Sequence, residues 1–436
     1  MQPNSPPPQQ SQAHPQTPSF YKETRLDSGV LVLSHAMPES QSVALGIFVD
    51  VGSRDESADC AGITHALEHM IFKGTRHLDV HQLADKLDAL GGNANAFTSR
   101  ERTCFHLHVL REAWPEALTL LTEMICAPAL PDQEWQRERE VIYAEIAMVD
   151  DQPDEWIIDQ HIASLFPDHP IGRPVLGSPD SLAALTREQL ADYLHAHYCP
   201  PHLLITAAGA IEHDALVDAL NRIRWPQPST PSHPTRRQQP PVMHAGIQLL
   251  PRQIEQAQMI LSYPGIHASD AARPIAWLAN QMLGGGVSSL LFREVREKRG
   301  LAYHIGSYLN ALRDTGLWSI TCGAEPERMA DCIALIRQLM GDYADQLNEA
   351  TLQRAKQQLE VQLRMGIDAV EGQMLHLGGR LDESRLRSPF EWLEAIHAIT
   401  LDQVQQWSHA QLAQTPAWSI AAPEQALEKI SATLRP

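Results

Sequence analysis

Apolar residues recur along this chain at two spacings, and segments of each spacing alternate. Short alternating or continuous apolar runs predict strands at residues 29–33, 43–49, 95–97 and 103–110. The first two of these strands are predicted to pair with each other. Three-to-four spacing predicts helices at 62–72, 80–90, 114–126 and 132–150. The second of these ends at Gly91-Gly92, a common stop for a helix.

A proline-rich stretch without apolar periodicity divides the chain nearly in half. Such a stretch is typical of a semi-extended linker. The first residues are rich in proline, glutamine and serine, which is typical of a disordered tail. The predicted organisation is therefore a tail at 1–19, a first domain at 20–225, a linker at 226–245 and a second domain at 246–436.

The two halves follow similar outlines, each with a glycine-ended helix, a strand, a helix and a charged helix. In the second half these elements are predicted at 274–285, 317–322, 327–343 and from 348 onward. Superposing the two glycine-ended helices places Ala276 against His65, Ala279 against Glu68 and Asn280 against His69. The pattern predicts an α+β protein of two homologous domains, each with a mainly antiparallel sheet packed with helices.

The length of 436 residues and the hydrophobic content of 43% predict globular domains that each bury a core. The net charge of −19 argues against a nucleic-acid partner, which would require a basic surface. No apolar run is long enough to cross a bilayer, so no membrane partner is expected. Six scattered cysteines without a C-x-x-C pair, and no recognisable signal, favour a cytoplasmic location.

The strongest chemical signal is the segment His65-Ala66-Leu67-Glu68-His69. Two histidines four apart lie on one face of a helix, where both imidazoles can reach one metal ion, and Glu68 flanks the same place. This H-x-x-E-H order suits zinc-assisted hydrolysis, with Glu68 as the base beside an open coordination position. The alternative is two surface histidines with a glutamate between them.

A third ligand is needed, and the predicted charged helix offers carboxylates on one face at Glu134, Glu138 and Glu145. Spacing alone does not choose Glu145 over Glu138. A solvated acidic helix face is the alternative for the whole group.

Several motifs in order resemble the pitrilysin/insulinase family of inverzincin metallopeptidases, in its short bacterial, mitochondrial-processing-peptidase-like branch. The segment from His65 to Thr75 is similar to the family's H-x-x-E-H-M-x-F-K-G-T, and residues 91–101 are similar to G-G-x-x-N-A-x-T-S-R-E. Residues 288–303 resemble R-L-F-x-x-I-R-E-K-x-G-L-A-Y. The resemblance spans nearly all of residues 20–436.

The resemblance implies roles for individual residues. Glu145, 76 residues after His69, would be the third zinc ligand with His65 and His69, one Zn²⁺ per chain. Glu138 would be a carboxylate that orients a histidine or modulates the site. Arg296 and Tyr303 would bind the substrate and stabilise the oxyanion from the second domain.

The resemblance also implies how a substrate binds. Asn95, Ala96, Phe97 and Thr98 would form an edge strand to which a peptide adds as an extra strand. The chain would be half of a clam, and two copies would close around a chamber as a homodimer, with a heterodimer of related chains as the other possibility. Whether Arg296 and Tyr303 would serve the zinc of their own chain or of the partner stays open.

These inferences favour a zinc endopeptidase or oligopeptidase acting on short or unfolded peptides. One alternative is a catalytically idle structural subunit of the same fold. Another is a partner that binds a precursor peptide during its maturation, where the chamber would matter more than the zinc.

Overall fold

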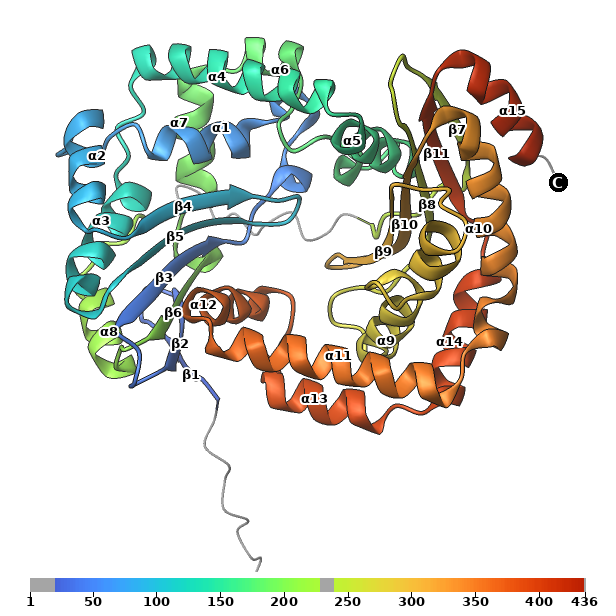
Figure 1. The fold of residues 1–436 in the computed structure, drawn as a ribbon. Coiled ribbons are helices and arrows are strands. Elements are labelled where there is room, and N and C mark those ends of the chain that lie inside the picture. Colours follow the sequence, from blue (N-terminus) through green and yellow to red (C-terminus); the bar gives the residue numbers. More distant parts are fainter. Residues whose placement is uncertain (1–19, 228–238, 435–436) are drawn as a thin grey trace, which may run out of the picture.

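The computed structural model describes residues 20–227 and 239–434 and contains two sheets, one in each half of the chain (Figure 1). The predictions for the tail and for residues 228–238 of the linker lie outside the described residues. The first sheet has the order β1 (Lys22–Arg25), β2 (Leu31–Ala36), β6 (Leu203–Gly209), β3 (Ser42–Val49), β5 (Thr103–Leu110) and β4 (Asn93–Thr98). The second has the order β7 (Gly246–Pro251), β11 (Ala417–Ala422), β8 (Ala257–Pro264), β10 (Gly316–Ala324) and β9 (His304–Ala311).

The second sheet repeats the last five strands of the first. In each set of five, the first strand (β2 or β7) pairs in parallel with the last strand of its half, and the remaining pairs are antiparallel. In the first sheet, β1 adds to β2 as a sixth strand, also antiparallel. This correspondence and the surrounding helices confirm the predicted α+β class with two similar domains.

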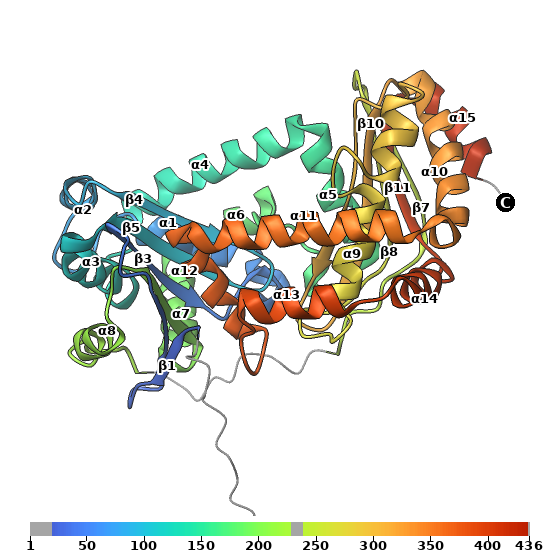
Figure 2. The ribbon, with the colours of Figure 1, turned by 60° about the horizontal axis from the view of Figure 1, so that its bottom comes forward.

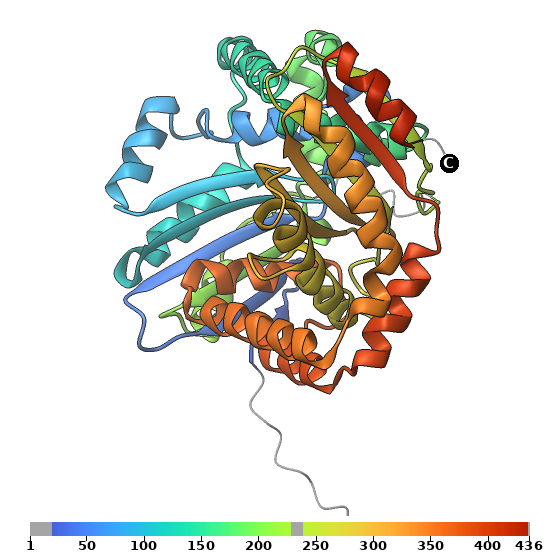
Figure 3. The ribbon, with the colours of Figure 1, turned by 45° about the vertical axis from the view of Figure 1, so that its right-hand side comes forward.

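Most helices pack against the hydrophobic core of their own half. In the first half these are α1 (Ile63–Ile71), α2 (Val80–Ala89), α3 (Trp114–Cys126), α6 (Pro179–Ala184), α7 (Arg187–His197) and α8 (His213–Leu220). In the second half they are α9 (Arg273–Gly284), α10 (Pro326–Gln346), α13 (Pro389–Ala398), α14 (Leu401–Leu412) and α15 (Glu424–Leu434). Figure 3 shows α10, α14 and α15, orange to red, outside the second sheet. Among the described residues, no helix is long and apolar enough to span a bilayer.

The two halves exchange helices across their boundary. The long helix α4 (Asp132–Asp151) leads into α5 (Pro153–Leu165), which packs on β8 and β11 of the second sheet. In return, α11 (Glu349–Asp368) leads back to α12 (Val370–Gly378), which packs on β2, β3 and β6 of the first (Figure 2). Each sheet is therefore covered on one face by a helix from the other half.

The exchanged helix α12 approaches the first sheet very closely. A Cβ atom on Gly46 of β3 would lie 2.4 Å from Met374 Sδ, and one on Gly378 would lie 2.4 Å from Phe48 Cζ. Met374 and Leu377 are fully buried in this contact. The two glycines remove side chains that would hold the helix away from the strand.

A buried polar cluster also joins the halves. Arg54 pairs with Glu101 and donates two hydrogen bonds of 3.0 Å to Asp314, which lies in the turn between β9 and β10. The backbone N–H of Arg313 donates to Glu101 at 2.9 Å, and its guanidinium donates to Asp50 at 2.8 Å. Charges of both signs are thereby compensated where the halves meet, which fixes their relative orientation.

One predicted pairing is wrong. The segments predicted at 29–33 and 43–49 are both strands, but β6 lies between them, parallel to β2 and antiparallel to β3. The first of these strands begins only at Leu31, because the chain turns at Gly29 with φ of +95°. An inserted strand from 203–209 leaves no trace in the local pattern of residues 29–49.

Candidate metal centre

Helix α1 presents its polar face to α4 and to the edge strand β4. Its opposite face, with Ile63 and Leu67, is almost fully buried in the core of the first half. Because the apolar face is fixed in this way, His65, Glu68 and His69 turn together toward α4 and β4.

The beginning of α1 is held by a buried carboxylate. Glu56 accepts hydrogen bonds from the backbone N–H groups of Gly62 at 2.8 Å and Thr64 at 2.9 Å. Gly62 adopts φ of +92°, and a Cβ atom there would lie 2.8 Å from the carbonyl oxygen of Leu176. The carboxyl oxygens of Glu56 thereby accept hydrogen bonds from N–H donors that the start of the helix leaves free.

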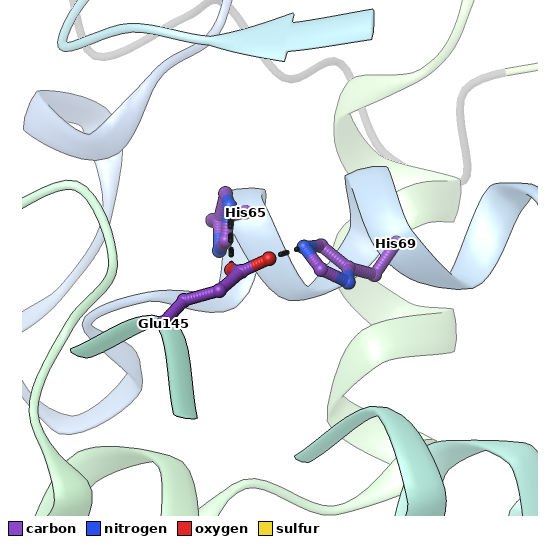
Figure 4. A group of neighbouring side chains, drawn as sticks. All are labelled: His65, His69 and Glu145. Carbon is purple, nitrogen blue, oxygen red and sulfur yellow. Dashed lines mark ion pairs between the residues drawn. The ribbon is translucent and has the colours of Figure 1, made fainter. Parts of the chain in front are cut away.

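The three predicted ligands converge on one point (Figure 4). Oε2 of Glu145 lies 3.4 Å from Nε2 of His69 and 3.8 Å from Nε2 of His65. Tetrahedral zinc with bonds of about 2.0–2.2 Å places its ligand atoms about 3.4 Å apart. Within 20–227 and 239–434, these three form the one group of His, Cys, Asp or Glu side chains whose ligand atoms all lie within 4.8 Å of one another.

The protonation state of His65 also suits a metal. Burial, and then the neighbouring His69, lower the pKa of His65 to about 3, so its imidazole is neutral near pH 7. A neutral imidazole offers a lone pair to a cation, whereas a protonated one would repel it. Two imidazole nitrogens and one carboxylate oxygen at these distances therefore fit Zn²⁺.

Glu138 supports the centre from the side of His69. Its Oε2 lies 3.0 Å from His69 Nδ1, and its Oε1 lies 2.8 Å from Nζ of Lys73. A carboxylate on Nδ1 fixes the tautomer in which Nε2 is free, which is the arrangement found beside metal-binding histidines. Geometry thus separates Glu138 from Glu145, while Glu134 pairs with Arg137 instead.

Glu68 lies beside the three ligands and accepts a hydrogen bond at Oε2 from the Thr98 hydroxyl. Burial raises the pKa of Glu68 above its ordinary value, and Glu145 adds to this, while Thr98 and His69 act in the opposite direction. A carboxylate with a raised pKa binds a proton more readily, which suits a general base.

The residues predicted to bind substrate lie in two places. Asn95, Ala96 and Phe97 are in β4, the edge strand of the first sheet, where Phe97 is 37% exposed. In the part of the chain that the structure describes, the outer side of β4 has no partner strand.

Arg296 and Tyr303 lie together in the second half of the chain. The Arg296 guanidinium is 5.9 Å from the centre of the Tyr303 ring and 4.9 Å from that of Phe292. Tyr303 is 73% exposed. Among the described residues, neither side chain has a hydrogen bond or ion pair to the three ligands or to Glu68.

Sequence reasoning missed three contacts at this centre, made by Glu56, Lys73 and Thr98. Lys73 lies two residues beyond the end of α1, so helical spacing from His69 gave no signal for its contact with Glu138. Thr98 was predicted only as part of the substrate strand. Its hydroxyl contact with Glu68 depends on how β4 packs on α1, which no local spacing reveals.

We expect Glu56 to make stability depend on pH. Burial raises the pKa of Glu56 to about 7, above the ordinary 4.5, although its bonds to Thr64 and Gly62 act against this. Its contribution to the free energy of unfolding is therefore full below pH 4.5 and is lost as the pH rises through about 7. Urea unfolding of wild type and Glu56→Gln should show their difference shifting by about 2–3 kcal/mol between pH 5 and pH 8.

Because the two proteins share every other titrating group, the difference isolates Glu56. A difference that stays constant from pH 5 to pH 8 would contradict the raised pKa.

Comparison with family models places both halves of the chain in one family. Residues 31–179 match the model described as insulinase (peptidase family M16), and residues 184–359 match the peptidase M16 inactive domain. The second match begins at the end of α6 in the first half and extends into α11 of the second half.

Relatives match over nearly their whole length. An uncharacterized zinc protease of Streptomyces coelicolor is 34% identical over 92% of this chain and 89% of its own. An uncharacterized zinc protease of Mycobacterium tuberculosis is 35% identical over 91% of this chain and 92% of its own length.

Solved structures show the same fold. A chain described as the peptidase M16 inactive domain from Pseudomonas fluorescens has a TM-score of 0.84 at 20% identity, covering 92% of this chain and 98% of that one. A protease from Helicobacter pylori has a TM-score of 0.84 at 17% identity, covering 92% and 99%. With its sequence matched over both halves, the chain belongs to the insulinase family of peptidases, peptidase family M16.

Proposed function

We propose that this protein is a zinc-dependent endopeptidase or oligopeptidase that binds one Zn²⁺ per chain and cleaves short or unfolded peptides. The observation that carries the proposal is the convergence of His65, His69 and Glu145 on one point beside Glu68. Relatives of similar length are named zinc proteases, which agrees with this donor set.

The chain's own residues divide the chemistry between them. When bound, zinc supplies a Lewis acid that polarises the scissile carbonyl and acidifies the attacking water. Glu68 Oε2 is occupied by the Thr98 hydroxyl, so Oε1 is the atom that takes a proton from the water and delivers it to the leaving nitrogen. Glu138 and Lys73 keep His69 in the tautomer that the site needs.

The substrate is held as an added strand along β4. An extended peptide would pair with the free edge at Asn95, Ala96 and Phe97, whose far end reaches Thr98 beside Glu68. Backbone hydrogen bonds depend little on the side chains of the peptide, so binding of this kind has low sequence specificity. It requires an extended peptide and therefore favours substrates without stable structure. Arg296 and Tyr303 would hold the substrate carbonyl and the developing oxyanion.

A second subunit would complete the site. Arg296 and Tyr303 form an exposed pair whose polar groups have no partner among the described residues, which leaves them available to a neighbouring chain. We therefore propose a homodimer that encloses a chamber, with a heterodimer of related chains as the alternative. Light scattering of the purified chain would distinguish a dimer from a monomer.

The proposal is tested by zinc content together with cleavage of a mixed pool of unstructured peptides. We expect zinc near one per chain and cleavage that a chelator abolishes and added zinc restores. Zinc without cleavage would favour the precursor-peptide partner or a missing second chain. A chain that binds no zinc would be an idle structural subunit, and the proposal would be wrong.

Replacing Thr98 tests its contact with the base. Thr98→Val removes the hydroxyl but keeps the shape, so we expect kcat to fall about tenfold, the value of one hydrogen bond to a charged group. Thr98→Ser keeps the hydroxyl and should retain most activity. Equal activity of the two variants at equal zinc content would show that the contact does not position Glu68.

A further inference from the structure

A second polar site lies in the half of the chain that has no metal ligands. A cavity of about 170 Å³ opens between α9, α10, α11 and the π-helical turn Phe292–Glu297. None of the residues of the metal centre lines it. We call it the α11 cavity, and the lining residues that matter are Gln281, Ser288, Ser289, Arg293, Arg354 and Gln358.

Two arginines give the α11 cavity a positive wall. The guanidinium groups of Arg293 and Arg354 have no hydrogen bond or ion pair among the described residues, although both residues line the cavity. The one carboxylate in the lining, Glu294, is already bound by Lys298 at 2.6 Å and Arg299 at 2.9 Å. The unmatched charge in the cavity is therefore positive.

A buried hydroxyl in the same lining lacks a partner. Ser289 is 4% exposed, and its Oγ has no hydrogen bond in the described residues. Buried polar atoms are almost always satisfied, so an unsatisfied hydroxyl in the wall of a cavity is suited to bind a polar ligand atom.

The side-chain amides of two glutamines in the lining are fixed by hydrogen bonds. Gln281 donates to Gln358 at 3.0 Å, and Gln358 donates in turn to Ser288 at 3.4 Å.

The beginning of α11 faces the same space. Asn348, the N-cap of this 20-residue helix, lines the cavity together with Thr351. The N-terminus of a helix carries partial positive charge and attracts anions. Two guanidiniums without a partner among the described residues, an unpaired hydroxyl and a helix N-terminus thus all offer hydrogen-bond donors or positive charge to one half-open cavity, at whose rim Arg354 and Asn348 are exposed.

We propose that the α11 cavity binds a small oxyanion, a carboxylate or phosphate carried by a compound of metabolite size. Guanidinium groups pair with both kinds of oxyanion through paired hydrogen bonds. A cavity of about 150 Å³ holds a molecule of the size of benzene, so the part of the ligand that enters has on the order of six to ten heavy atoms.

Calorimetric titration of the zinc-loaded chain at constant ionic strength tests the proposal, with inorganic phosphate and glutarate as separate probes. We expect saturable binding with Kd of about 1 mM or below for at least one of them. The Arg293→Gln/Arg354→Gln double variant should bind at least about tenfold more weakly, because charged hydrogen bonds are lost. The probe that binds identifies the ligand as phosphate-like or carboxylate-like.

Arg364→Gln is the matched control, since Arg364 lies on α11 but pairs with Glu360 outside the cavity. It should bind the probes like wild type.

Ser289→Ala, a milder change, should weaken binding while leaving the thermal melting of the chain unchanged. Absence of saturable binding by both probes overturns the proposal, as does equal binding by the double variant, which would place the probe elsewhere, for instance at the zinc. Because the readout is binding, the result is independent of whether the chain cleaves peptides.

Discussion

Glu68→Gln will lower kcat for peptide hydrolysis by about a thousandfold while the zinc content stays at one per chain. Glutamine keeps the shape of the side chain and can still accept the hydrogen bond from Thr98. It cannot take a proton from water, because its amide has no basic oxygen at neutral pH. The three ligands are untouched, since Glu68 contributes no atom to the group of His65, His69 and Glu145.

The measurement is single-peptide kinetics together with zinc determination by mass spectrometry. Glu140→Gln is a suitable control, because Glu140 is an exposed carboxylate of α4 outside the centre. Glu140→Gln should leave both kcat and the zinc content unchanged. A Glu68→Gln protein with full activity would remove Glu68 as the base, and one that lacks zinc would show that its effect is structural.

Glu145→Gln will weaken zinc binding by more than about a hundredfold, since groups that only support zinc histidines are already worth about 10–100-fold. Glu145 approaches both imidazoles with the same oxygen, so its replacement removes the only carboxylate that faces both Nε2 atoms among the described residues. Glu138→Gln should behave differently. It keeps a group beside His69 Nδ1 but loses the charge shared with Lys73, so zinc remains and turnover falls about tenfold.

Competition with a zinc indicator gives both affinities, and the same Glu140→Gln variant tests the loss of an exposed charge from the helix. If the two phenotypes were exchanged, Glu138 would be the ligand and Glu145 the supporting carboxylate. If neither variant lost zinc affinity, the metal would lie elsewhere.

Local periodicity predicted many element bounds closely. The strand at 103–110 and the helix at 114–126 match β5 and α3, because most apolar positions of each lie in the core of its own half. The same reasoning failed where partners lie far along the chain. The strand β6, between β2 and β3, and the exchange of α5 and α12 involve contacts between residues more than 100 positions apart.

In the candidate site, too, the local features could be predicted from the sequence and the contacts between distant segments could not. Spacing along α1 brought His65, Glu68 and His69 to one face, and this depends on helix geometry alone. The choice between Glu138 and Glu145 depends on how α4 crosses α1, and spacing left it open. The structure separates them because Glu138 reaches the Nδ1 side of His69 and Glu145 reaches the Nε2 side. Two residues of the motif at 91–101 make unrelated contacts, since Thr98 contacts Glu68 while Glu101 joins the two halves.

The exchange of α5 and α12 makes the two halves inseparable as folding units. A gene fragment that ends in the linker would encode a first sheet whose apolar face, including Phe48 and Leu204, lacks the cover of Met374 and Leu377. Such a fragment would expose a contiguous hydrophobic surface and aggregate. Two fragments produced together can supply each other's missing helix, so the chain would tolerate being split into two genes but would not tolerate the loss of either product.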